Sequence, residues 1–168
     1  MEKENDLVVL AIESGSLCIS LNFYNGDLYF YSINYRTTEE YLNIIGTDTS
    51  ISVEREYYID KEDKEKTVER INFEIQEDKD LLKRFNDTIM IRHKEKIMKR
   101  QITGNEVKQL LLVLLDYIDE LTKKGLPGLT EKVRNVVKSE SIKFEYKRPE
   151  IITLEGNKKW SVIDYETK

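Results

Sequence analysis

Cysteine and histidine are almost absent from this sequence. Its 168 residues include one cysteine, Cys18, and one histidine, His93. A single cysteine excludes a disulfide within the chain and any metal site built from several cysteines. His93 stands between Arg92 and Lys94, whose positive charges disfavour the protonated imidazole and supply no carboxylate to orient a general base. The sequence therefore predicts no metal and no other cofactor.

Familiar catalytic motifs are missing as well. The sequence holds no glycine-rich phosphate loop and no Gly-x-Ser-x-Gly nucleophile motif. The enzymatic alternative is a site made of carboxylates alone, for which Asp116 and Glu120 stand one helical turn apart. The same spacing is typical of a solvated stripe opposite an apolar face. We therefore expect the protein not to be an enzyme.

Long hydrophobic runs are also lacking. The longest, residues 7–12 and 110–115, fall far short of the ~20 apolar residues that a membrane helix needs. Residues 1–6 are acidic, whereas a secretory signal begins with basic residues. The 39% of hydrophobic residues is enough for a core, and the length fits one domain over 1–168, with an alternative sub-boundary near 47–50. We expect a globular, non-membrane protein of the bacterial or host-cell cytoplasm.

The first 36 residues predict an antiparallel β-meander. Residues 7–13 are apolar on both faces, and residues 16–24 alternate between apolar and polar side chains. Asn25-Gly26 is a strong hairpin signal, because a type I′ turn needs two residues that tolerate positive φ. A two-residue loop places Phe23 opposite Leu28 and continues that register along both strands. One face of this hairpin then carries the tyrosines Tyr24, Tyr29, Tyr31 and Tyr35.

Two capping-box patterns predict helix starts. Thr37 to Glu40 predicts a short helix that Gly46 ends, and Thr103 to Glu106 begins a long helix over about 104–124. The long helix has apolar residues at helical spacing from Val107 to Leu121. Shorter helices are expected over the ranges 78–86 and 130–138.

The remaining segments are expected to be strands and loops. They comprise a hairpin over 51–59 and 71–75 with a charged loop at 60–66, an extended basic ribbon at 88–102, and strands at 142–147, 151–154 and 160–165 with a turn at 155–157. No regular alternation of strands and helices indicates a parallel sheet. The fold class is therefore α+β: N-terminal antiparallel hairpins packed by one long helix and short helices, with C-terminal strands.

Acidic charge is concentrated at the N-terminal end of the sequence. The net charge is −5 overall, and residues 1–50 hold 8 acidic and 2 basic residues. Tyrosine is favoured at interfaces, because it buries a large area at small entropic cost and keeps a polar tip. We expect a protein partner, such as a nucleic-acid-binding effector, to dock on this acidic face. The predicted contacts are Tyr24, Tyr29, Tyr31, Tyr35 and Asp27. The alternative is that these tyrosines form a second core layer under a helix.

Basic charge is concentrated in residues 92–100. The candidates for phosphate contacts are Arg92, Lys94, Lys96, Lys99 and Arg100. Such a ribbon could bind nucleic acid with salt-dependent affinity. Lysines also protect exposed sheet edges from aggregation without any ligand. Nucleic acid is therefore the second choice of partner.

The sequence thus favours a small, acidic, non-enzymatic binding protein that inhibits or neutralises a macromolecular target. Alanine occurs once and lysine outnumbers arginine 19 to 8, which indicates an AT-rich genome such as that of a low-GC bacterium or its mobile elements. A phage or mobile-element anti-defence inhibitor of the anti-CRISPR type fits these features, and so does an immunity protein. The alternative is a nucleic-acid-binding accessory protein. Long strands and an almost wholly apolar helix also make a homodimer an option.

Overall fold

The computed structural model describes the backbone of residues 7–24, 26–47, 49–60, 63–76, 79–87, 91–154 and 157–165. Side chains are described in these ranges except at 59–68, 92 and 148–165. Within these ranges the chain forms eight strands and four helices. In chain order they are β1 Leu7–Ser14, β2 Leu17–Tyr24, β3 Asp27–Arg36, β4 Glu40–Thr47, β5 Ser50–Asp60, β6 Asp63–Gln76, α1 Lys79–Phe85, α2 Ile91–Met98, α3 Gly104–Thr122, α4 Glu131–Ser139, β7 Lys143–Leu154 and β8 Asn157–Tyr165.

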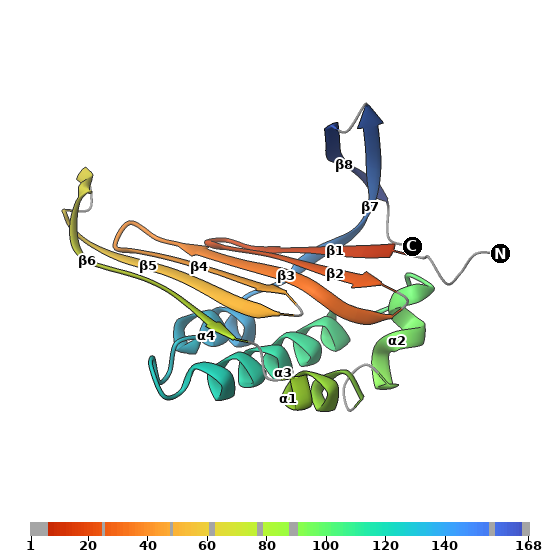
Figure 1. Cartoon of the computed structure of the whole chain (residues 1–168), viewed down its shortest axis with the longest axis horizontal. Helices are drawn as coiled ribbons and strands as arrows, with labels where there is room; N and C mark the ends of the chain where they lie inside the picture. Colours follow the sequence, from red (N-terminus) through yellow and green to blue (C-terminus); the bar gives the residue numbers. More distant parts are fainter. Residues whose placement is uncertain are drawn as a thin grey trace.

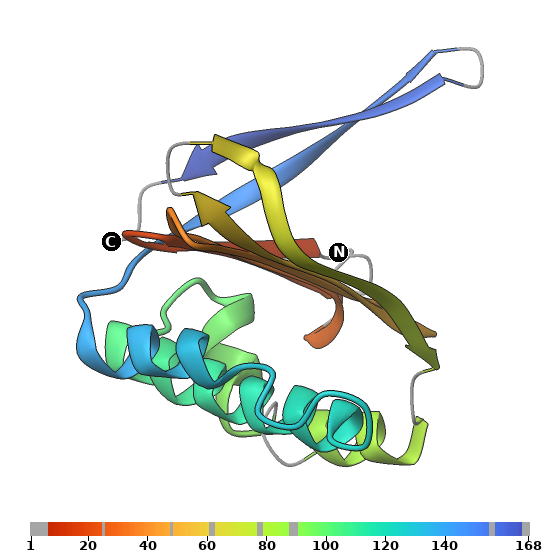
Figure 2. The ribbon, with the colours of Figure 1, turned by 90° about the vertical axis from the view of Figure 1, so that its left-hand side faces the viewer.

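The strands form one antiparallel sheet in the order β6-β5-β4-β3-β2-β1-β7-β8. Strands β1 to β6 follow one another as a meander. The chain then passes through the four helices and returns to add β7 beside β1. The helices gather on one face of the sheet, as Figures 1 and 2 show. This is the α+β fold that the sequence predicted.

The core lies between the sheet and α3. Alternate residues of β2 point toward the helices and are fully buried, among them Leu17, Leu21 and Phe23. Leu110 and Leu114 of α3 pack in the same hydrophobic cluster. Apolar residues recur every second position along the strand and about every 3.6 positions along the helix, so each element has one apolar face, and these two faces pack together.

The long helix begins as predicted. The Thr103 side chain accepts a hydrogen bond from the Glu106 backbone N–H, and the Glu106 side chain accepts one from the Thr103 backbone N–H. The helix ends at Thr122, close to the expected end near residue 124. The short helices α1 and α4 lie within one residue of their expected ranges 78–86 and 130–138.

The helix predicted after Thr37 was wrong, because residues 40–47 form strand β4. The Thr37 Oγ1 accepts from the backbone N–H groups of Glu39 and Glu40, both at 3.1 Å, and the Thr37 N–H donates to the Glu40 carbonyl at 2.8 Å. The hydroxyl therefore closes a reverse turn and not a helix. Gly46 has a packing role, because the Tyr31 ring occupies the space that a side chain there would need.

The extended ribbon predicted at 88–102 was also wrong. Residues 91–98 form helix α2, while 88–90 lie outside the described residues. His93 and Ile97, four residues apart, are both buried on the side of α2 that faces the core. Arg100, with φ of 57°, then ends this segment in a left-handed conformation.

The second hairpin is longer than predicted. Strand β5 extends to Asp60 and β6 begins at Asp63, so the loop expected at 60–66 was wrong for residues 60 and 63–66. Residues 61–62 lie outside the described part. The expected strands 142–147 and 151–154 join as the single strand β7, whose first half pairs with β1 and whose outer half pairs with β8. Residues 155–156 of the expected turn are likewise outside the described part.

Candidate protein-binding surface

The open face is the side of the sheet opposite the described helices. Its centre is uncharged and mixes polar with apolar side chains, all half-buried: Ser20 and Asn22 on β2, Phe30, Ser32 and Asn34 on β3, and Asn43 and Ile45 on β4. The side chains of Asn34 and Asn43 are joined across the strands by a 3.5 Å hydrogen bond. Serine and asparagine supply adaptable hydrogen-bonding groups at binding surfaces.

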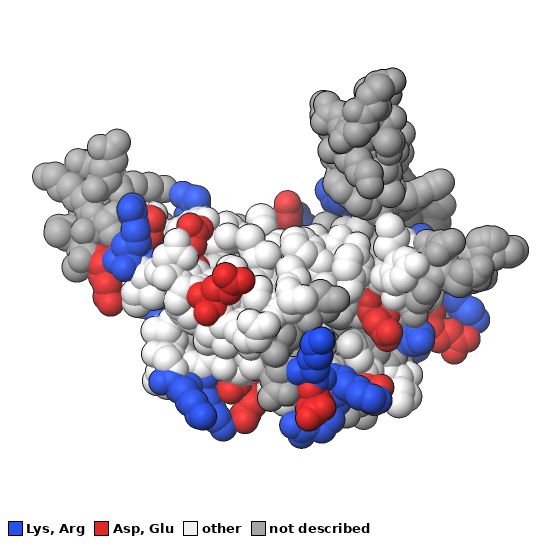
Figure 3. Space-filling view, in the orientation of Figure 1, with Lys and Arg blue, Asp and Glu red and all other residues white. Residues whose placement is uncertain are grey.

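Charged side chains lie around this centre. Among the described side chains that β2 to β4 place on the open side, the charged ones are Asp27 and Arg36, at opposite ends of β3. Glu54 on β5 and Glu74 on β6 are exposed and make that edge acidic. Figure 3 views the sheet from its edge and shows Lys, Arg, Asp and Glu side chains gathered mainly toward the two ends and along the helix layer. Depletion of charge at the centre with a charged rim is typical of protein interfaces.

Tyr24 and Tyr29 lie together at one end of the open face. Their side chains are 43% and 38% exposed, and their rings meet edge to face with centroids 6.2 Å apart. A β-bulge between β2 and β3 leaves Tyr29 without a partner in the register, so that it turns to the same side as Tyr24. The structure thus brings together two of the tyrosines predicted to bind a partner.

The bulge also shows that the predicted hairpin register was wrong beyond Phe23. Phe23 lies opposite Leu28 as expected, but Leu21 then lies opposite Tyr31. One extra residue reverses the face of every later side chain on β3. Tyr31 and Tyr35, at 2% and 9% exposed, therefore belong to the core and not to the predicted binding face. For these two tyrosines the alternative of a second core layer is correct.

The turn between β2 and β3 packs against helix α2. Gly26 has a φ of 92°, and the aliphatic part of Lys94 fills the space beside it. Asp27 follows as an exposed residue, and Ile91, one helical turn before Lys94, is 77% exposed. Two predicted contact sets therefore meet at this corner: Tyr24, Tyr29 and Asp27 from the protein-binding set, and Lys94 from the nucleic-acid set.

Most of the other basic candidates already have partners. Lys96 forms an ion pair with Glu106, and Lys99 forms one with Glu95 at 2.8 Å. Arg100 donates from Nη1 to the Met98 carbonyl at 3.2 Å. The Lys96 ammonium is the main cause that lowers the pKa of Glu106 to about 2.

The basic candidates also do not form the extended ribbon expected from the sequence. They lie on and just after helix α2, and the side chain of Arg92 is outside the described part. Lys94 and Lys96 stand two positions apart on α2 and so lie on different faces of the helix. The partners already present neutralise part of the charge that would attract phosphates.

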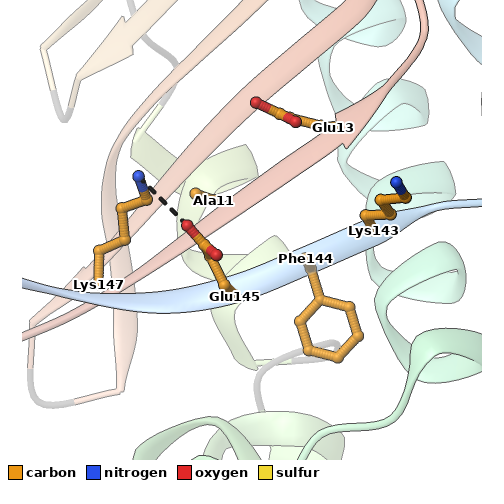
Figure 4. A pocket seen from close by; sticks show the side chains of 6 residues that line it. All are labelled: Ala11, Glu13, Lys143, Phe144, Glu145 and Lys147. Carbon is orange, nitrogen blue, oxygen red and sulfur yellow. Dashed lines mark ion pairs between the residues drawn. The ribbon is translucent and has the colours of Figure 1, made fainter. Parts of the chain in front are cut away.

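A shallow hollow lies on the open face where β7 joins β1. One part, of about 150 Å³, is lined by Ala11, Glu13 and four residues of β7, shown in Figure 4. Phe144 points to the opposite side, toward the helices. An adjoining part, of about 280 Å³, runs over Cys18, Ser20, Ser32 and Asn34 to Lys147. Small side chains on the three adjacent strands β1 to β3 leave this space.

Sequence reasoning missed two further tyrosines on the open face. The Arg36 guanidinium lies 4.6 Å from the centre of the Tyr41 ring, and the Tyr58 hydroxyl donates to Glu56 at 3.2 Å. Burial and this hydrogen bond raise the pKa of Tyr58. The alternation of apolar and polar residues over 40–47 could have predicted the position of Tyr41. If Leu42 points toward the core, its neighbour Tyr41 points to the opposite face of the sheet.

The carboxylates considered for catalysis on α3 are engaged in ion pairs. Asp116 pairs with Arg134 at 2.7 Å, and Glu120 pairs with Lys123 at 2.8 Å. Among the side chains that the structure describes, no group of three or more His, Cys, Asp or Glu residues is placed to hold a metal ion. The described helices include none with the length and apolar character needed to span a bilayer.

Known proteins add nothing to this picture. No protein family, no curated protein and no solved structure matches the chain. What the surface does therefore has to be argued from its own residues.

Proposed function

We propose that this chain is a non-enzymatic binding protein that inhibits or neutralises a macromolecular target, and that it docks a protein on the open face. The observation that supports this most is the position of its exposed apolar side chains. Among the described residues, the exposed large hydrophobic side chains are Tyr24, Tyr29 and Ile91. Tyr24 and Tyr29 flank the β2–β3 turn at the end of the open face, and Ile91 lies on α2, which packs against that turn from the helix side.

The chemistry of the surface favours a protein partner over a nucleic acid. Clustered aromatic side chains are the usual energetic centre of a protein interface, surrounded by polar contacts that exclude water. Nucleic acids instead require a row of cations for their phosphates. The open face has an uncharged centre, and two of the four described basic candidates on and after α2 are held in ion pairs.

The composition of the chain supports a class of target. A small acidic protein from an AT-rich genome fits a phage or mobile-element inhibitor of a bacterial defence system, or an immunity protein. Such inhibitors work by occupying the surface with which the target acts. A target that normally binds nucleic acid has a basic surface, and the acidic β5–β6 edge beside the open face complements it.

The test is an affinity pull-down from a lysate of a low-GC bacterium, with nuclease and at two salt concentrations. The double variant Tyr24→Ala/Tyr29→Ala is compared with wild type, and Lys124→Ala, an exposed change at the end of the helix layer, is the matched control. We expect one stoichiometric protein that survives nuclease, that the control retains and that the double variant loses.

Titration with the purified partner then gives the size of the effect. A buried interface tyrosine contributes about 2 kcal/mol, so each substitution is expected to weaken binding about 30-fold. A partner that binds the double variant as tightly as wild type would refute docking at this corner. Recovery of nucleic acid alone, lost at high salt, would favour the alternative on α2.

A further inference from the structure

Strand β6 is an edge of the sheet. In the strand order it stands at the end and pairs with β5, and no other strand that the structure describes pairs with its outer side. In Figure 2 β6 forms one border of the sheet, and the described helices lie beneath the sheet and not beside that border. An edge of this kind presents a row of backbone N–H and C=O groups with which a further strand can pair.

The part of β6 from Glu69 to Gln76 is regular. It pairs with residues 50–57 of β5 without a break, and the register shifts of this hairpin begin beyond Tyr57. Natural sheet edges are commonly protected by bulges, prolines or lysines. The stretch 69–76, which the structure describes throughout, contains none of the three. It therefore lacks the usual protection against pairing with another strand.

This stretch has an apolar side and a polar side. The side chains toward the helices are half-buried and apolar: Ile71, Phe73 and Ile75. The side chains on the open side are exposed and polar: Arg70, Asn72 and Glu74. Phe73 lies opposite the buried Val53 of β5 and packs against the core. A strand added beside β6 would therefore extend both the apolar layer and the open face.

Pairing of β6 with the β6 of a second copy is restricted to a few registers. Opposite residues in an antiparallel pair direct their backbone groups the same way, so each residue lies opposite one an even number of positions away. A two-fold centre at Glu69, Arg70 or Glu74 places that charge opposite its own copy. A centre at Asn72 instead places Arg70 opposite Glu74 of the second copy. Within 69–76 it is the one centre that sets opposite charges against each other.

Arg70 is able to accept this second carboxylate. Its Nε lies 3.0 Å from Glu56 of its own chain, and its side chain is still 67% exposed. A guanidinium has further donors on its Nη groups, which suit a carboxylate. In a two-fold contact each pair occurs twice, and opposite charges across antiparallel strands stabilise the pairing whereas like charges destabilise it. On the other side of the strand, Ile71 lies opposite Phe73 of the second copy.

We propose that this chain forms a two-fold dimer in which the β6 strands of two copies pair antiparallel, with Asn72 at the centre. The two sheets then join into one. Because opposite residues point to the same side of a sheet, both open faces lie on the same side of the dimer. This contact is separate from the Tyr24–Tyr29 corner, and it does not depend on the function proposed for the open face.

The test measures the mass of the full chain by sedimentation equilibrium over a range of protein concentrations. Wild type is expected to reach twice the mass of one chain. Glu74→Arg places arginines opposite Arg70, and Arg70→Glu places glutamates opposite Glu74. Each change is expected to raise the dissociation constant of the dimer at least about tenfold. Glu131→Arg, an exposed charge reversal on α4, is the matched control and should dimerise as wild type does.

Mixing the two variants separates the proposed contact from a general loss of stability. A chain with Arg70→Glu and a chain with Glu74→Arg are complementary at both ion pairs. Their equimolar mixture is therefore expected to form a dimer under conditions in which each variant alone is monomeric. Wild type that stays monomeric at the highest concentration, or two folded variants that do not associate on mixing, would overturn the proposal.

If either variant fails to fold, the unmodified protein decides. Its amide NMR shifts are recorded on serial dilution, because residues at the contact lose their partner as the dimer dissociates. We expect the shifts to change at residues 69–76 and to stay constant at residues 143–147 of β7 and at Tyr24. Changes confined to other regions would place the contact elsewhere and refute pairing through β6.

Discussion

The two faces of the sheet use the same residue type in opposite ways. Tyr31 and Tyr35 lie under the helices and complete the core, whereas Tyr24 and Tyr29 lie on the open side with their rings exposed. All four come from one hairpin of twenty residues, so local composition does not distinguish them. What separates them is one bulged position in the pairing of β2 with β3. The register of β2 with β3 therefore decides whether a tyrosine belongs to the core or to the open face.

The largest effect is expected where a charge enters the helix-covered side. Leu114 of α3 is fully buried, and Leu114→Asp places an unpaired carboxylate in the core. We expect a loss of more than about 4 kcal/mol, enough to unfold the chain. Circular dichroism during urea denaturation measures it. Asn105→Asp puts the same charge on the exposed first turn of α3 and should fold as wild type does. A cooperative, fully helical Leu114→Asp protein would contradict the placement of this helix.

The next largest difference is expected between a buried and an exposed tyrosine, in the free energy of unfolding that each loses on truncation to alanine. Tyr31→Ala leaves a cavity in the core and should lower the free energy of unfolding by about 3 kcal/mol. Tyr29→Ala, on the bulge, should change it by less than about 1 kcal/mol. Urea denaturation of both single variants under identical conditions gives the comparison. Equal losses for the two positions would mean that the faces do not differ as the register implies.

The two capping boxes show how much the sequence could predict and why the rest was missed. In both, the threonine hydroxyl accepts a hydrogen bond from the backbone N–H three residues later: Thr37 from Glu40, and Thr103 from Glu106. Only the second is followed by four turns of apolar residues at helical spacing. After Thr37 the apolar residues alternate, with Leu42 and Ile44 inward. A local hydrogen-bond pattern therefore locates a turn of the chain, but the period that follows decides between helix and strand.

The candidate site was predictable only in part for a related reason. Tyr24 follows directly from the alternation of β2, and Tyr29 was placed with it. The bulge that turns Tyr31 and Tyr35 toward the core is one extra residue in the pairing of β2 with β3, and the Asn25-Gly26 turn signal does not reveal it. A hollow around Glu40 joins the end of β3, the start of β4, the last part of β5 and the start of α4. Contacts so far apart in the chain become visible only once the topology is known.

A smaller effect is expected at the place where Tyr31 meets the neighbouring strand. Gly46→Ala adds a methyl group into space that the Tyr31 ring fills, and should cost about 1–3 kcal/mol. Gly125→Ala is the matched control, because nothing lies near its added carbon, and should stay within about 1 kcal/mol of wild type. Thermal denaturation compares them. In Tyr31→Leu the cost of Gly46→Ala should shrink, because the ring is gone; an unchanged cost would place the strain elsewhere.

The smallest effect concerns pH and the start of α3. The hydrogen bond from Lys96, and then that from the Thr103 backbone, lower the pKa of Glu106 to about 2 in the folded chain, below its ordinary value of 4.5. A lowered folded-state pKa means that the carboxylate stabilises the fold above its unfolded pKa, and that this contribution is lost as pH falls through about 2. The stability difference between wild type and Glu106→Gln should therefore be constant near neutral pH and shrink from about pH 5 toward pH 2. Lys96→Met removes the main cause of the shift and brings the folded-state pKa closer to the unfolded one, so in that background the decline should be smaller and should finish at a higher pH. A difference that does not change with pH would mean that Glu106 acts at the cap through geometry alone, and that the charge of α2 contributes nothing to the helix layer beneath the open face.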